Sequence, residues 1–123
     1  MEGKALHDFD FENLDVYQQS LSFVDRLFTL CESFPVSVDR TLGDQLRRAS
    51  VSIPNNIAEG SNKLSKKAKA QFYGYALDSA RECIPMLTIV FRRKLMSEGD
   101  HGALRSQCLS ACRMLRGLIR SIS

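Results

Sequence analysis

Apolar residues recur at intervals of three and four along four stretches of this 123-residue chain, which is the period of an amphipathic α-helix. No stretch alternates apolar and polar residues over a useful length, and the Asn-Gly and Asp-Gly dipeptides typical of hairpin turns are absent from the sequence. The pattern therefore predicts an all-α protein. The expected helices span residues 13–34, 37–59 (or 39–59), 65–96 and 103–121.

Residues typical of helix ends bound these stretches. Pro35 stops the first helix, because the residue before a proline is disfavoured in the helical conformation. Ser37 or Asp39 is the expected N-cap of the second helix, and Ser65 is the expected N-cap of the third. Gly60 is expected to end the second helix in the left-handed conformation. Residues 97–102 are expected to form the last loop.

Four helices joined by short connections predict an antiparallel up-down-up-down four-helix bundle over residues 13–123, after an N-terminal tail or arm of residues 1–12. The first helix is expected to have one apolar face. Its centre is Tyr17, Leu21, Val24, Phe28 and Cys31, and Phe23, Leu27, Leu30 and Phe34 widen it. The third helix carries two adjacent apolar stripes, more than a bundle helix needs. One stripe is Phe72, Ala76, Ser79, Ala80, Cys83, Leu87 and Val90, and the other is Tyr73, Leu77, Ile84, Phe91 and Leu95. Either a second copy of the chain or the arm, with Phe9 and Phe11, is expected to cover the surplus.

A second, polar stripe runs along the second helix. Arg48, Ser52, Asn55 and Glu59 follow one another at spacings of four, three and four, around a proline, Pro54, in the helix interior. Two interpretations are open for this stripe. It forms a surface for interaction or assembly, or its side chains hydrogen-bond to backbone groups that the proline leaves free. The full candidate set adds neighbours, including a glutamate that could pair with an arginine from the adjacent helix: Arg47, Arg48, Ser52, Asn55, Asn56, Glu59 and Glu82.

The same region carries a family resemblance. Residues 46–60, LRRASVSIPNNIAEG, resemble the signature of the bacterial four helix bundle protein family, first recognised as reading frames within intervening sequences of 23S rRNA genes. The patterns Phe72-x-x-x-Ala76-x-x-Ser79-x-x-Glu82 and Phe11-x-x-Leu14-x-Val16-Tyr17 extend the resemblance over most of residues 9–120. The resemblance implies a four-helix bundle, and no catalytic residues are established for the family.

Relatives of this family include the accessory variability determinant protein of diversity-generating retroelements, a strongly basic pentamer that works with a reverse transcriptase and nucleic acid. The resemblance therefore implies a homo-oligomer, with a pentamer as the expected form. It also implies RNA, DNA or a protein as the partner. At a net charge of +3 this chain is only mildly basic.

Charge is unevenly distributed along the chain. Residues 1–45 carry three Lys and Arg against nine Asp and Glu, or −6, whereas residues 46–123 carry fourteen against five, or +9. The two halves either attract one another within a bundle or leave a basic surface that meets a polyanion. The candidate nucleic-acid contacts are Lys63, Lys66, Lys67, Lys69, Arg92, Arg93, Arg113, Arg116 and Arg120; the simpler interpretation is a solvated surface.

Motifs of enzymes and cofactor sites are absent, which predicts a protein with no catalytic residues, cofactor or metal. The four cysteines, Cys31, Cys83, Cys108 and Cys112, lie among apolar residues and are expected to be buried and reduced. No apolar run approaches the ~20 residues that cross a membrane, and the chain starts without a signal-peptide pattern, so a cytoplasmic location is expected. The sequence thus predicts a non-enzymatic oligomeric adaptor for RNA, DNA or a nucleic-acid enzyme; the alternative is a protein-binding scaffold without nucleic-acid contact.

Overall fold

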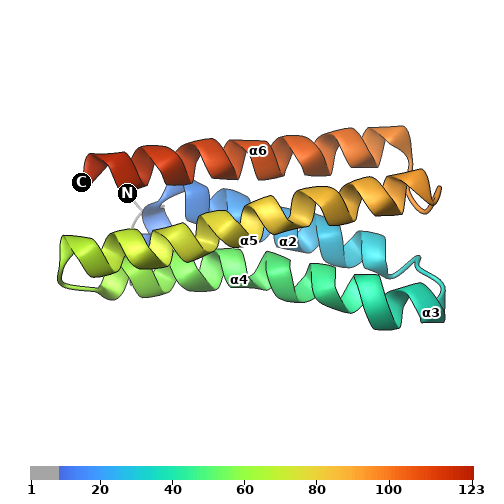
Figure 1. Ribbon diagram of the computed structural model, residues 1–123, viewed down its shortest axis with the longest axis horizontal. Coiled ribbons are helices and arrows are strands. Elements are labelled where there is room, and N and C mark those ends of the chain that lie inside the picture. Colours follow the sequence, from blue (N-terminus) through green and yellow to red (C-terminus); the bar gives the residue numbers. More distant parts are fainter. Residues whose placement is uncertain (1–8) are drawn as a thin grey trace, which may run out of the picture.

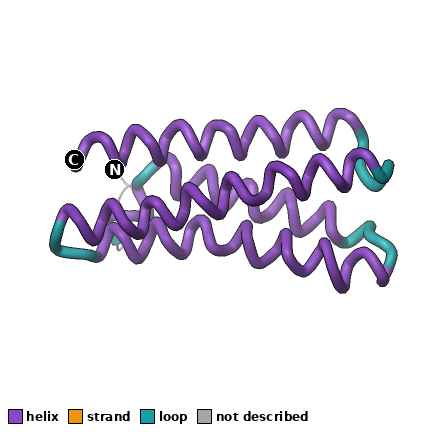
Figure 2. Tube along the Cα trace, viewed as in Figure 1, coloured by secondary structure: helices purple, strands orange, loops and turns teal. Residues whose placement is uncertain are grey.

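The computed structural model describes residues 9–123. Over that range the fold consists of four long helices and contains no strand, as the sequence pattern predicted (Figures 1 and 2). The long helices are α2 (Asp15–Cys31), α4 (Asp44–Asn62), α5 (Lys66–Arg92) and α6 (Glu98–Ser121). Three short segments complete the chain, the 3₁₀ turn η1 (Asp10–Asn13), α3 (Val36–Val38) and the π-helical turn η2 (Asp39–Gly43).

The four long helices lie side by side, and their connections fall at two ends (Figure 1). The connection between α4 and α5 lies at the same end as the C-terminus; we call this the Lys63 end. The connections that follow α2 and α5 lie at the opposite end, which we call the Ser97 end. The chain thus places residues around 63–69 and the last turns of α6 at one end.

Apolar side chains from all four helices form one core between them. The most deeply buried large side chains include Leu27, Leu46, Ile53, Ile57, Leu87, Leu104 and Leu115. Helices α4, α5 and α6 supply all of these residues except Leu27, which belongs to α2. No helix in residues 9–123 combines the length and apolar character needed to cross a membrane.

In α2 only part of the predicted face is buried. Leu21 and Phe28 are 36% and 39% exposed, whereas Phe23, Leu27 and Cys31 are buried. The helix packs against both α4 and α6. The stripe that points between those two helices is therefore the buried one: Val16, Ser20, Phe23, Leu27 and Cys31.

The predicted role of Gly60 is wrong. Helix α4 continues through Asn62, and no glycine in the described part of the chain has a positive φ. A Cβ atom at Gly60 would lie 2.8 Å from two ring carbons of Tyr73 on α5, a side chain that is itself buried. The glycine is needed because α4 and α5 approach closely there, not because the chain turns.

Helix boundaries near the Ser97 end also differ from the prediction. The expected loop 97–102 is mostly helix, because Ser97 caps α6 by accepting a hydrogen bond from the Asp100 backbone N–H at 3.0 Å. Helix α5 ends at Arg92, and Lys94 takes the left-handed conformation with φ 61°. The predicted N-cap Ser65 is confirmed, with the Ala68 N–H donating to its hydroxyl at 3.0 Å.

The start of the second predicted helix differs as well. Val36 begins a helical segment directly after Pro35, and the residues that join α3, η2 and α4 all keep right-handed helical angles. Neither Ser37 nor Asp39 therefore serves as an N-cap. Helix α4 passes through Pro54 and α5 passes through Pro85, as the sequence indicated.

Residues 1–8 of the predicted arm lie outside the described part of the chain. The remaining arm residues pack on α2: the Phe11 ring lies 5.0 Å from the ring of Tyr17, edge to face, and Phe9 stacks on Phe11 at 5.6 Å. Phe11 thus contacts α2, and the turn η1 that contains it also packs on α4. On α5, Leu77 and Ile84 are half-buried against the core, whereas Tyr75 and Ile89 remain exposed.

Candidate functional site

The two charged ends of the polar stripe on α4 are paired locally. Arg48 is 80% exposed and its Nε lies 3.2 Å from a carboxylate oxygen of Asp44, one turn earlier. Glu59 lies 3.6 Å from the Nζ of Lys63, one turn later. Exposed pairs of this kind contribute little to stability, on the order of 0.3–0.5 kcal/mol each. The stripe therefore presents polar groups to solvent at both ends.

The middle of the stripe joins α4 to α5. The Ser79 hydroxyl donates to the Ser52 Oγ at 2.9 Å, and the Asn56 Nδ2 donates to both the Oγ and the carbonyl oxygen of Ser52 at 2.9 Å. Asn56 therefore binds the Ser52 carbonyl and not the Ser50 carbonyl that Pro54 leaves free. Asn55, by contrast, is exposed. Ser52 and Asn56 thus have a structural role between the helices.

Arg47 and Glu82 do not meet, contrary to the expected ion pair. The Arg47 Nη1 lies 2.6 Å from a carboxylate oxygen of Asp39, and this hydrogen bond raises the pKa of the guanidinium. Within residues 9–123, Glu82 has no ion-pair partner within 4.0 Å. It lines a hollow of about 420 Å³ between α4 and α5, together with Arg48 and the Ser52–Ser79 pair.

A second hollow lies between α2 and α4. Its volume is about 600 Å³, and the exposed ring of Phe28 faces residues of the polar stripe there. The other lining residues come from α4: Arg47, Arg48, Val51, Ser52, Asn55 and Asn56. Sequence reasoning missed this site because it assigned Phe28 to the core.

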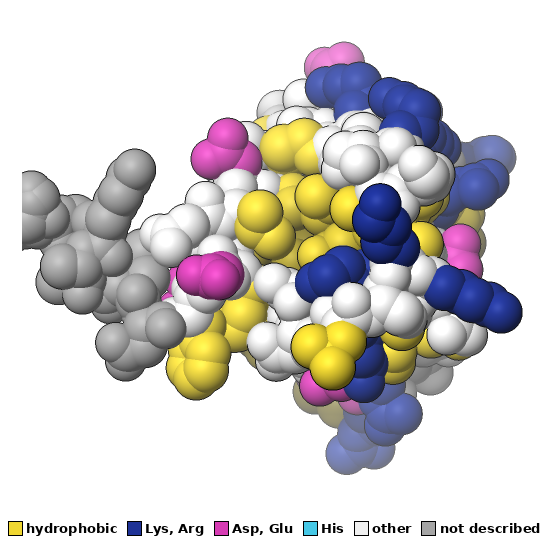
Figure 3. All heavy atoms as spheres, turned by 90° about the vertical axis from the view of Figure 1, so that its left-hand side faces the viewer, with side chains coloured by type: hydrophobic (Ala, Val, Ile, Leu, Met, Phe, Trp, Pro, Cys, Tyr) yellow, Lys and Arg dark blue, Asp and Glu magenta, His cyan; other side chains and the backbone are white. Residues whose placement is uncertain are grey.

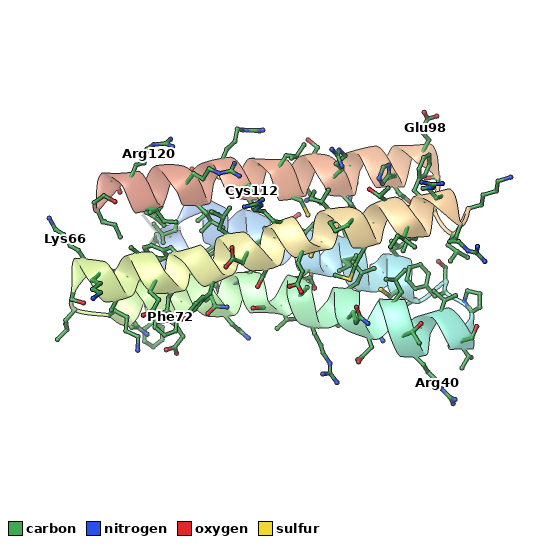
Figure 4. The ribbon with its side chains drawn as sticks, viewed as in Figure 1. Arg40, Lys66, Phe72, Glu98, Cys112 and Arg120 are labelled. Atoms are coloured by element: carbon green, nitrogen blue, oxygen red, sulfur yellow. The ribbon has the colours of Figure 1, made fainter. Side chains whose placement is uncertain are left out.

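The nine candidate nucleic-acid contacts separate into two groups. Figure 4 shows Lys66 and Arg120 near one end of the bundle, and Arg40 and Glu98 near the other. Seven of the nine belong to the α4–α5 connection, to the start of α5 or to the second half of α6: Lys63, Lys66, Lys67, Lys69, Arg113, Arg116 and Arg120. Arg92 and Arg93, at the C-terminal end of α5, lie at the Ser97 end.

Viewed onto the Lys63 end, lysine and arginine side chains gather mostly on one side, around apolar side chains (Figure 3). Lys66, Lys67, Arg116 and Arg120 are exposed. Lys69 is held by a hydrogen bond from its Nζ to the Ser61 carbonyl at 2.9 Å. Since Glu59 is the one carboxylate paired here within 4.0 Å among the described residues, this side keeps an excess of positive charge.

Aromatic side chains accompany these lysines, which the sequence reasoning did not foresee. The Lys63 Nζ lies 4.7 Å from the centre of the Phe72 ring, close enough for a cation–π interaction. Phe72 also contacts Tyr75 edge to face, with ring centres 5.4 Å apart. Phe72 had been placed in the core stripe. The sequence feature that could have indicated an exposed aromatic side chain is Tyr75, because it falls outside both apolar stripes of α5.

The four cysteines are buried and unpaired, as predicted. Burial raises the pKa of the Cys31 and Cys112 thiols, and a hydrogen bond with Cys83, together with burial, raises that of Cys108. These thiols are therefore protonated at neutral pH. No group of three or more His, Cys, Asp or Glu side chains suited to a metal ion occurs in residues 9–123.

Comparison with known proteins identifies the family. The chain is similar to the crystal structure of a protein of unknown function from the S23 ribosomal protein family of Bacteroides thetaiotaomicron, with a TM-score of 0.77 and 20% sequence identity over 85% of this chain and 97% of that one. At this identity the similarity supports the fold alone. No protein with a curated description matches. The model of the 23S rRNA-intervening sequence protein family matches residues 12–117, and the chain therefore belongs to that family.

Proposed function

We propose that this protein is a non-enzymatic adaptor that binds RNA or DNA, alone or with a nucleic-acid enzyme, through the Lys63 end of an antiparallel up-down-up-down bundle. The supporting observation is that lysines of residues 63–69 and arginines of α6 meet at one end although they lie about 50 positions apart in the sequence. When lysine and arginine side chains neutralise phosphates, counterions bound to the nucleic acid are released, and their release favours binding.

The proposal includes self-association in the cytoplasm. Large apolar side chains remain exposed on the outside of one chain, among them Leu21, Phe28 and Leu109. A homo-pentamer, as the family resemblance implies, would cover part of this surface and repeat the cations of the Lys63 end, so that one nucleic acid meets several sites. The four unpaired thiols suit a reducing compartment. Light scattering on the purified protein is expected to give an oligomer mass; a monomer at all concentrations would contradict this part.

Direct contact with nucleic acid is tested by titrating the full chain into labelled structured RNA and labelled single-stranded DNA over a salt series. We expect binding that weakens as salt rises, with the logarithm of the affinity falling linearly with the logarithm of the salt concentration. Lack of detectable binding at low salt, with the oligomer intact, would contradict the proposal that this protein contacts nucleic acid directly.

The alternative function is a protein-binding scaffold, and the hollow between α2 and α4 favours it. An exposed aromatic ring, Phe28, beside Arg47, Arg48 and Asn55 combines residue types that are enriched in protein interfaces. Light scattering on Phe28→Ala and Arg48→Ala separates the two proposals. If assembly is lost in both while nucleic-acid binding by the wild-type chain is absent, the scaffold is the better description.

A further inference from the structure

We propose that the exposed ring of Tyr75, supported by Phe72, forms a stacking platform for an unpaired base, so that the Lys63 end prefers single-stranded nucleic acid to duplex. This inference rests on the proposed function and specifies its ligand. The two rings lie one turn apart on α5, with centres 5.4 Å apart at 80°. Tyr75 is 44% exposed, which leaves much of its ring open to a partner.

The platform is held in place by its neighbours. The Gln71 Nε2 donates to the Tyr75 hydroxyl at 2.8 Å, one turn earlier on the same face of α5. The Lys63 Nζ lies over the Phe72 ring at 4.7 Å and is itself paired with Glu59 at 3.6 Å. A ring whose position is already restricted loses less conformational entropy when a base stacks on it.

Cations for the phosphates lie next to the platform. Lys67, Gln71 and Tyr75 follow at spacings of four and so share one face of α5. Lys66 and Lys67 are exposed, and neither has an ion-pair partner within 4.0 Å in the part of the chain that the structure describes. Asp78 lies one turn beyond Tyr75 in the other direction and would repel a phosphate there. The strand is therefore expected to run from Tyr75 toward Lys67.

The combination of an exposed aromatic ring and unpaired lysines favours a single strand over a duplex or a second copy of this chain. A base stacked on an aromatic ring contributes affinity whatever its identity, because every base has a π-face. A duplex keeps its bases paired and stacked and would use the lysines alone. A second copy of this chain would have to bring carboxylates to two unpaired lysines, whereas a nucleic acid brings a phosphate with every base.

The test measures the affinity of the full chain for a fluorescein-labelled 20-nucleotide single strand and for the matching duplex, by anisotropy at low salt. Three variants are compared: Tyr75→Leu, the double variant Lys66→Gln and Lys67→Gln, and a control, Ile89→Ala, which removes an exposed apolar side chain of α5 at the other end. We expect Tyr75→Leu to weaken single-strand binding about tenfold and to leave duplex binding within twofold. The lysine variant should weaken both, and the control should change neither.

Tyrosine fluorescence gives an independent readout. The chain has no tryptophan and three tyrosines, of which Tyr73 is buried and Tyr17 packs against Phe11. We expect the single strand to quench the fluorescence of the wild type and Tyr75→Leu to remove most of this quenching. Circular dichroism confirms that each variant is folded.

The outcomes separate the two proposals. If the lysine variant weakens binding but Tyr75→Leu leaves single-strand affinity within twofold, the platform is wrong and the proposed function stands. If Tyr75→Leu changes the oligomer mass instead, the rings are a subunit contact and the platform is also wrong. If the wild type binds neither strand form, both proposals fail.

Discussion

The two ends of the bundle carry similar residues in different settings. At the Lys63 end, Phe72 lies under Lys63 and beside an exposed Tyr75, and arginines from α6 lie at the same end. At the Ser97 end, Phe91 stacks in parallel on the half-buried ring of His101, with centres 4.4 Å apart, and the short cation run that begins at Arg92 has acidic residues of α6, Glu98 and Asp100, at the same end. The sequence shows two comparable basic runs, but only one gathers cations from two helices around open aromatic rings.

The largest expected effect compares the Ser97 end of the bundle with its interior. Cys31 is the last residue of α2, at the Ser97 end, whereas Cys112 lies well inside α6. Because both are buried and their thiol pKa values are raised, we expect a thiol reagent to label each at least ~1,000-fold more slowly in the folded than in the unfolded chain at pH 7. Single-cysteine variants would measure the rates. Fraying at the helix end should make Cys31 the faster; rapid labelling of Cys112 would contradict the buried core.

Raising the pH should speed labelling of the unfolded chain before that of the folded chain. A raised pKa means that a higher pH is needed to form the thiolate, which is the reactive species. Under native conditions, the labelling rate should therefore reach its midpoint at a higher pH than it does for a free cysteine. If the native profile coincides with that of a free cysteine, burial does not raise the pKa values of these thiols.

Charge reversal tests whether the ends differ in binding. We expect the double variant Lys66→Glu and Lys67→Glu to weaken nucleic-acid affinity about 30- to 100-fold at moderate salt, because two phosphate contacts become repulsive. The matched double variant Arg92→Glu and Arg93→Glu, at the Ser97 end, should change the affinity less than about threefold. Anisotropy titrations at two salt concentrations measure both. Equal losses would show that the basic surface is not confined to the Lys63 end.

Glycine substitutions compare the packing of the two ends. Gly60→Ala places a methyl group 2.8 Å from the Tyr73 ring, so we expect a net loss of about 1–2 kcal/mol in the free energy of unfolding. Gly102→Ala, in α6 at the Ser97 end, meets nothing within 4 Å and should gain about 0.5–1 kcal/mol from helix propensity. Urea unfolding followed by circular dichroism gives both values. A stabilising Gly60→Ala would mean that the two helices can separate at no cost.

The smallest difference is expected between the N-caps. Ser65 caps α5 at the Lys63 end and Ser97 caps α6 at the Ser97 end, each with one hydrogen bond of 3.0 Å. Replacing either by alanine should cost about 1 kcal/mol in the free energy of unfolding, without a marked difference between the two. Urea midpoints at constant m-value measure this. A much larger loss at one end would show that the cap there has a second, tertiary role.

Features that depend on neighbours in the sequence could be predicted. The hydroxyl of Ser65 caps α5 through a bond to a residue three positions away. Pro35 does not mark the end of the first helix, because α2 ends at Cys31 and not at the predicted residue 34. The burial of all four cysteines also followed from their position among apolar residues. The fold class rests on the same kind of evidence, since amphipathic periodicity is a property of each helix by itself.

The candidate site could be predicted only in part. The predicted nucleic-acid contacts included the seven cations of the Lys63 end. They also included Arg92 and Arg93 of the other end, because the positions of charges in the sequence do not show which helix ends lie together. Ser52 and Ser79 lie 27 residues apart, and their hydrogen bond exists only after α4 and α5 pack. The exposed Phe28 was assigned to the core for a similar reason, since two adjacent stripes on α2 are both apolar and only contact with α4 and α6 selects one.

Helix period, caps and charge are local properties, so the order of residues was enough to predict four amphipathic helices with a basic second part. Packing between helices was needed to show that Gly60 is a contact between helices rather than a helix end, and that Lys63, Phe72 and Tyr75 share one surface with cations nearby. Such choices depend on the distances between helices, and packing of the whole core sets those distances.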